Sequence, residues 1–162
     1  YILEGIYFYS GFMFFYNLER NGKMPGSAQE IRYINRDENT HLWLFRNIIR
    51  ELRNENPELF TEDVKNELRE MMRTGVEQEI LWGYYVIGDK IQGINKKLIE
   101  DYIKYLGNKR LKEINLEPIF EGYTQNPASW VDRQSNANSV KTDFFEARST
   151  AYAKAATLVD DL

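Results

Sequence analysis

The chain contains no cysteine, a single histidine and only four prolines among its 162 residues. Without cysteine there is no disulfide, no thiolate metal site and no cysteine nucleophile. Its net charge of −4 gives no electrostatic attraction for nucleic acid, so we expect no nucleic-acid partner. No basic-then-apolar secretory segment is visible in the sequence, and we therefore expect a cytoplasmic protein in a reducing environment.

The amino-acid composition is typical of one folded domain, because 43% of the residues are apolar and 14% are aromatic. The first residue is Tyr1, and the apolar pattern that follows has no capping residue before it. We therefore expect the chain to begin inside a helix. A cleavage product, a processed half of a split protein and an expressed fragment would each begin in this way.

Residues 1–20 form an apolar and aromatic stretch that predicts a helix buried on nearly all sides. A membrane span is the less favoured interpretation, because the run is short for a bilayer and contains Glu4 and several tyrosines. We therefore expect no membrane association. Ser27 followed by Glu30 has the spacing of a capping box, which predicts a second helix that continues until Pro57.

Two further helices are predicted downstream. Thr61, followed by acidic residues, predicts a third helix that ends near Gly88, and Asn95 predicts the start of a fourth that ends near Asn115. The final residues are polar and have no sustained period. The sequence thus predicts an all-α protein with a helical bundle at residues 1–125 and an extended, flexible tail at 126–162.

Glu38 and His41 have the spacing Glu-x-x-His on the second predicted helix. This spacing alone is weak evidence, because glutamate is common in the chain. However, the apolar positions around the pair recur every three or four residues, which predicts that the pair faces the core. The predicted inward stripe consists of Ile31, Ile34, Glu38, His41, Phe45, Ile48 and Leu52.

Glu4 lies in equally apolar surroundings, and Arg20 is the first cationic residue after it. A buried carboxylate is normally paired, protonated or bound to a metal, and carboxylates with imidazole suit iron or manganese. Helical bundles bind two such ions with a glutamate from each of two helices and Glu-x-x-His from each of two others. Glu4, Glu38 and His41 make one such set, so we expect another polypeptide to supply the other.

Simpler interpretations remain open at this stage. Glu4 could be solvated at a frayed chain end, while Glu38 pairs with an arginine such as Arg36 and His41 is a hydrogen-bonded core residue. Asp37 could be an ordinary surface acid or a carboxylate that orients a ligand imidazole. Periodicity alone does not separate these possibilities.

The string from Ile34 to His41, preceded by Glu4 in an aromatic helix, closely resembles the second half of the class I ribonucleotide reductase small subunit. Other stretches are similar to later parts of this family and follow in the same order. They are residues 82–89, 102–106 and 108–111, and Asn126-Pro127 with Trp130. The resemblance extends over essentially the whole chain.

This resemblance implies a ferritin-like bundle with a dinuclear iron, manganese or mixed centre that stores an oxidising equivalent, in many members on a tyrosine. The equivalent then passes to a separate large subunit, where the ribonucleotide is reduced. Glu4, Glu38 and His41 would be metal ligands, and Asp37 would belong to the electron and proton path. The residues expected to line the dry pocket around the radical are Phe8, Phe12 and Ile34.

The resemblance also assigns roles to the tail. Glu146 and Tyr152 would carry the oxidising equivalent across the subunit boundary, and the apolar residues Leu158, Val159 and Leu162 would dock on the large subunit. The family further implies a dimer of small subunits.

The remaining ligands and the usual radical tyrosine would lie before residue 1, so the chain should be inactive without the N-terminal half of the small subunit. Two alternatives are a metal-free scaffold that only docks on the large subunit and another ferritin-like di-iron oxidase. The tail argues against the latter, because such an oxidase has no need of Glu146 and Tyr152 on a detachable terminus.

Overall fold

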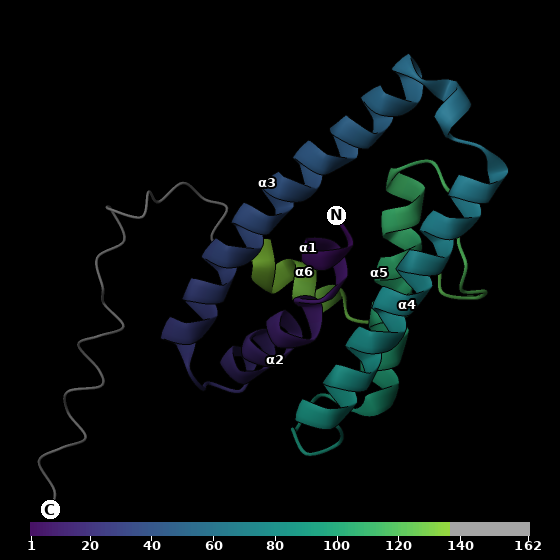
Figure 1. Cartoon of the computed structure of the whole chain (residues 1–162). Helices are drawn as coiled ribbons and strands as arrows, with labels where there is room; N and C mark the ends of the chain where they lie inside the picture. The colour runs from purple at the N-terminus through teal and green to yellow at the C-terminus, as the bar shows by residue number, and fades with distance from the viewer. Residues whose placement is uncertain (137–162) are drawn as a thin grey trace, which may run out of the picture.

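A computed structural model describes residues 1–136, and every regular element in this part is helical, which confirms the all-α prediction. The elements in chain order are α1 (Ile2–Ile6), α2 (Tyr9–Arg20), α3 (Pro25–Glu55), the 3₁₀ helix η1 (Pro57–Leu59), α4 (Glu62–Val86), α5 (Lys96–Glu113) and α6 (Ser129–Asn136). Figure 1 shows α4 and α5 packed side by side, with α1 and α2 between this pair and the long α3. None of these helices is long and apolar enough to cross a membrane.

The single helix expected at residues 1–20 is in fact two helices, α1 and α2, separated at Tyr7 and Phe8. In an unbroken helix the Ser10 N–H would donate to the carbonyl oxygen of Ile6. Here it donates to Oε1 of Glu79, at 2.8 Å. A side chain from α4 therefore inserts into the hydrogen-bond ladder at this point, which local sequence patterns do not reveal.

The predicted capping box at Ser27 and Glu30 is wrong, because α3 already begins at Pro25 with Met24 as its N-cap. Proline is favoured in the first helical turn, since its φ is preset and its missing N–H would have no partner there. The other predicted caps are confirmed: Thr61 Oγ1 accepts from the Val64 N–H, and Asn95 Oδ1 accepts from the Leu98 N–H.

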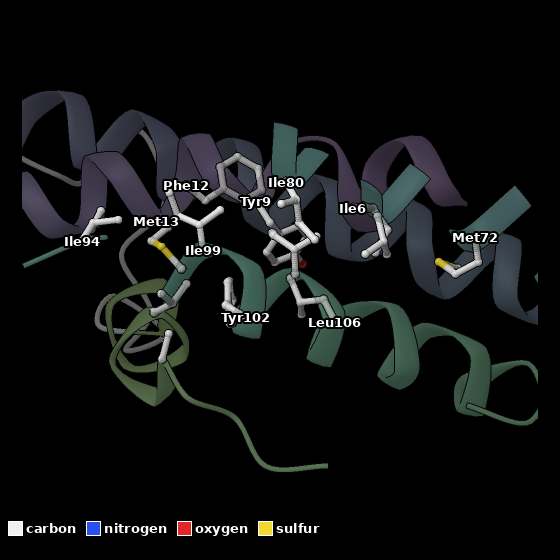
Figure 2. Packing of buried hydrophobic residues seen from close by; sticks show 14 of the residues in the cluster. Ile6, Tyr9, Phe12, Met13, Met72, Ile80, Ile94, Ile99, Tyr102 and Leu106 are labelled. Atoms are coloured by element: carbon white, nitrogen blue, oxygen red, sulfur yellow. The ribbon is translucent and has the colours of Figure 1, made fainter. Parts of the chain in front are cut away.

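The hydrophobic core lies between α1, α2, α4 and α5, with further apolar residues from the loops and α6. Figure 2 shows Phe12 and Met13 of α2 close to Ile99 and Tyr102 of α5. Gly83 allows α4 to approach this layer closely, because a Cβ atom there would lie 2.8 Å from Ile99 Cγ2 and 2.9 Å from Ser10 Oγ.

The inward stripe predicted on α3 is wrong for the described chain, because most of the stripe is exposed. Ile34, Phe45, Ile48 and Leu52 are between 39% and 45% exposed. Helix α3 instead packs through another face, whose buried residues are Ala28, Arg32, Asn35 and Leu42. The periodicity correctly marks an apolar face, but no element within residues 1–136 covers it.

The first part of the predicted tail is helical. Helix α6 packs against α2 and α3, with Val131 buried and the guanidinium of Arg20 4.3 Å from the centre of the Trp130 ring. The Asn35 side chain also donates to Ser135 Oγ at 3.0 Å. Residues 137–162 lie outside the described part, so the division into a bundle and a docking tail stays a prediction.

Candidate metal centre

The structure brings together the three predicted ligands Glu4, Glu38 and His41. One ligand atom from each lies within 4.8 Å of the others. Nδ1 of His41 lies 3.0 Å from Oε2 of Glu38 and 3.4 Å from Oε1 of Glu4. The spacing of three residues places Glu38 beside His41 on one face of α3, whereas Glu4 reaches the pair from α1, which packs against α3.

The start of the chain is held firmly against α5. The Tyr1 hydroxyl lies 2.9 Å from both the carbonyl oxygen of Arg110 and Oε2 of Glu113. Only 21% of the Glu4 side chain is exposed. The described structure therefore does not support the interpretation that Glu4 is solvated at a frayed end.

The cluster is rich in negative charge and incompletely satisfied. Oε2 of Glu4 is buried without a hydrogen-bond partner among the described residues. The hydrogen bond to Glu38 raises the pKa of the His41 imidazole, and the charges of Glu4, Glu38 and Asp37 add to this effect. A buried carboxylate oxygen without a donor is costly unless a proton or a cation satisfies it.

Arg36 does not pair with Glu38, as one alternative supposed. It forms an ion pair with Asp37 at 3.2 Å, in which both side chains are more than 60% exposed. His41 is also half exposed and is not a core residue. Asp37 is therefore a surface residue in the described chain, and its role in electron and proton transfer stays a prediction.

Phe8, Phe12 and Ile34 line one hollow of about 360 Å³ next to Glu38. Phe12 is buried, but Ile34 is 45% exposed, so the hollow is open on this side. Trp82 of α4 also lines the hollow. The structure thus gathers the expected pocket residues beside Glu38, while their function as a radical pocket stays a prediction.

The donor set fits one side of a dinuclear iron or manganese centre. Two carboxylates and an imidazole are ligands that these metals accept, and the unpaired Glu4 oxygen is available to a cation. Three donors are too few to hold two ions, which typically share four carboxylates and two imidazoles in helical bundles. The two other predicted functional residues, Glu146 and Tyr152, lie outside the described residues.

Sequence reasoning missed two buried charged residues that contact α1 or α2, Glu79 and Arg110, which are 1% and 4% exposed. The sequence does carry a signal for Glu79, because it lies on the same helical face as Met72, Val76 and Gly83, all of which are buried. Arg110 gives a weaker signal, since its contacts with Gly5 and Tyr9 join residues about a hundred positions apart.

The helical fold and the carboxylate–histidine cluster are typical of helical bundles that bind metal ions, and comparisons with known proteins make the assignment specific. Residues 1–127 match the family described as "Ribonucleotide reductase, small chain". The chain therefore belongs to the ribonucleotide reductase small-chain family.

Similar curated proteins are named ribonucleoside-diphosphate reductase subunit beta. The protein from Treponema pallidum is 64% identical over the whole chain, and the one from Halalkalibacterium halodurans is 46% identical over 94% of it. These matches cover only 47% and 44% of the two relatives, so the chain spans less than half of their length.

The ribonucleotide reductase R2 subunit from Clostridium botulinum superposes with a TM-score of 0.81 and 57% sequence identity, covering 83% of this chain and 43% of that structure. This match confirms the predicted ferritin-like helical fold.

Proposed function

We propose that the chain is the C-terminal half of a ribonucleotide reductase small subunit and supplies one side of its dinuclear metal centre. In this proposal the N-terminal half provides the remaining ligands and the radical-bearing residue. The observation that carries the proposal is the convergence of Glu4, Glu38 and His41 from two helices, in a chain that belongs to this family.

The exposed face of α3 supports the need for a second polypeptide. Ile34 and His41 lie on the same exposed face as Phe45, Ile48 and Leu52, so the cluster sits within an uncovered apolar surface. Contiguous apolar surface of this kind normally marks an interface. A partner that covered the stripe would also be placed to complete the ligand set.

When bound, a dinuclear iron or manganese centre would supply the oxidising equivalent used for ribonucleotide reduction. Glu4 and Glu38 would hold the ions and offset their charge, and His41 would add a neutral nitrogen donor. Phe8, Phe12 and Ile34 would exclude water from the neighbouring hollow once its open side is covered.

Transfer to the large subunit would use residues outside the cluster. Asp37 would connect the centre with a proton and electron path, and Glu146 and Tyr152 would continue that path in the tail. The terminal residues Leu158, Val159 and Leu162 would dock on the large subunit. Pairing of two assembled small subunits into a dimer completes the proposed architecture.

The proposal can be tested by producing the chain alone and together with the N-terminal half of the small subunit. Native mass spectrometry combined with metal analysis counts polypeptides and ions in one measurement. We expect the two halves together to bind two iron or manganese ions per assembled small subunit, and the chain alone to bind fewer. Ribonucleotide reduction after addition of the large subunit should require both halves and Tyr152.

Two results would contradict the proposal. Halves that associate without any transition metal would indicate a scaffold and docking fragment. An assembled metalloprotein that retains ribonucleotide reduction after Tyr152→Phe would show that the tail assignment is wrong.

A further inference from the structure

The interruption between α1 and α2 lies shortly after the candidate ligand Glu4. Two backbone groups near this break are bound by buried side chains from other helices. On the C-terminal side, the Ser10 N–H donates to Oε1 of Glu79 on α4, at 2.8 Å. On the N-terminal side, the carbonyl oxygen of Gly5 accepts from Nε of Arg110 on α5, at 3.3 Å.

Arg110 is well placed to hold its side of the break. Its Nη2 donates to the Tyr9 hydroxyl at 2.7 Å, and its Nη1 lies 3.1 Å from Oε2 of Glu113. Gly5 permits this approach, because a Cβ atom there would lie 3.1 Å from Nε of Arg110. One guanidinium therefore contacts both Gly5, near the end of α1, and Tyr9, the first residue of α2.

Glu79 binds the backbone on the C-terminal side of the break. A role in core packing alone does not explain why a carboxyl is buried there. A buried carboxylate is expensive, and an aliphatic side chain would pack in a helical core at less cost. Burial raises the pKa of Glu79 to about 7, while the hydrogen bond from the Ser10 N–H acts in the opposite direction. Burial of the Glu79 carboxyl therefore costs free energy, and the carboxyl accepts a hydrogen bond from one backbone N–H at the start of α2.

We propose that Glu79 and Arg110 are positioning residues that keep α1 and α2 separate and thereby fix the Glu4 carboxylate opposite Glu38 and His41. A continuous helix would change the direction of α1 relative to α2. Glu4 lies before the break and the pocket residue Phe12 lies after it. The position of Glu4 relative to Phe12 therefore depends on the break. This inference rests on the proposed function of the Glu4 cluster.

The test uses the small subunit assembled from both halves, with Fe(II) alone as the probe. Glu79→Leu removes the acceptor for the Ser10 N–H, whereas Glu79→Gln retains an oxygen that can accept it. Glu77→Leu is the matched control, because Glu77 is exposed on the same helix two residues away. Metal affinity is measured by titration, and the position of Glu4 by a crystal structure of each metal-free variant.

We expect Glu79→Leu to weaken Fe(II) binding roughly tenfold, as the loss of groups that orient metal ligands typically does. The same variant should show α1 and α2 joined, or Glu4 displaced from Glu38 and His41. Glu79→Gln and Glu77→Leu should stay within about twofold of the unsubstituted protein. A Glu79→Leu protein that binds Fe(II) normally, with the break and Glu4 unchanged, would overturn the inference even if it melted at a lower temperature.

A second variant keeps the inference testable if Glu79→Leu does not fold. Arg110→Lys keeps the positive charge but cannot contact Gly5 and Tyr9 together, so Fe(II) binding should weaken about threefold. Unchanged binding by this variant would overturn the inference. If the unsubstituted assembly binds neither Fe(II) nor Mn(II), the proposed function fails instead. The position of Glu4 in the metal-free variant structures then still decides whether Glu79 and Arg110 maintain the break.

Discussion

Glu79 is the residue whose protonation should be visible in the stability of the fold. Its pKa is raised from 4.5 to about 7 because the carboxyl is buried. The folded protein therefore binds this proton more tightly than the unfolded chain. The stabilising contribution is complete below about pH 4.5 and is lost as the pH rises through about 7.

We predict that Glu79→Gln removes this pH dependence, because an amide does not titrate. Between pH 5 and pH 8 the unsubstituted protein should lose up to about 3 kcal/mol of unfolding free energy relative to the variant. Urea denaturation of the assembled small subunit at both pH values measures the difference. Parallel pH profiles of the two proteins would contradict the raised pKa.

We predict that substitution of His41 or Glu38 weakens metal binding without unfolding the protein. Replacing His41 by alanine or Glu38 by glutamine should weaken iron binding by more than about tenfold, since even groups outside the ligand set have effects of that size. Metal analysis after dialysis measures the loss. The control Glu30→Gln changes an exposed glutamate on the same helix and should leave the metal content unchanged.

The clustering of Glu4, Glu38 and His41 could be predicted from the sequence because the information for it is partly local. Glu38 and His41 are neighbours through helical spacing alone. Glu4 stands out because it lies in an apolar stretch whose first cationic residue after it is Arg20. The partners of Glu79 could not be predicted in this way. Its contact with Ser10 joins residues 69 positions apart, and no periodic pattern specifies such a pairing.

Among the elements, α4 shows how the close packing of helices depends on glycine. A side chain at position 83 would lie too close to Ile99 of α5 and Ser10 of α2, which pack against this face of α4. We predict that Gly83→Ala destabilises the fold by about 1–3 kcal/mol, as other overpacked core substitutions do. Thermal or urea unfolding measures this change.

Gly11 provides the matched control for that substitution. It also lies within a helix, but a Cβ atom there would have no neighbouring side chain or packed helix within 4 Å. Gly11→Ala should stabilise the fold by about 0.5–1 kcal/mol, since alanine has the higher helix propensity. Equal effects of the two substitutions would contradict the close approach at Gly83.

The boundaries of the elements were predictable where a cap or a proline determines them. The starts of α4 and α5 were predicted from their N-caps, Thr61 and Asn95. The end of α3 was predicted from Pro57, which follows shortly after it. The break near Tyr7 and the helix after Asn126 were not predictable, because they depend on tertiary partners. The break involves a hydrogen bond from the Ser10 N–H to Glu79 of α4. Helix α6 is stabilised by packing of Trp130 and Val131 against other helices.

For the whole molecule, the exposed stripe on α3 predicts behaviour that changes with the presence of the N-terminal half. The isolated chain should bind a fluorescent hydrophobic dye and self-associate, because a contiguous apolar face is open to water. Addition of the N-terminal half should reduce dye binding. Dye fluorescence and sedimentation velocity provide the measurements, and equal dye binding with and without that half would contradict the prediction.

A single substitution on this face should separate association from folding. Ile48→Glu places a charge in the stripe and should weaken association with the N-terminal half by roughly tenfold or more, through the lost apolar burial. Arg50→Gln alters an exposed residue outside the stripe and should have little effect. Circular dichroism of both variants checks that the helices remain intact.

The position of Glu4, Glu38 and His41 within an open face has a thermodynamic consequence. If a second polypeptide completes their coordination, capture of the ion and joining of the two chains are one linked equilibrium. Any factor by which the ion tightens the pairing must equal the factor by which pairing tightens retention of the ion. Scarcity of the metal would then loosen the assembly itself, and the quantity of intact complex would report how much of the ion is available.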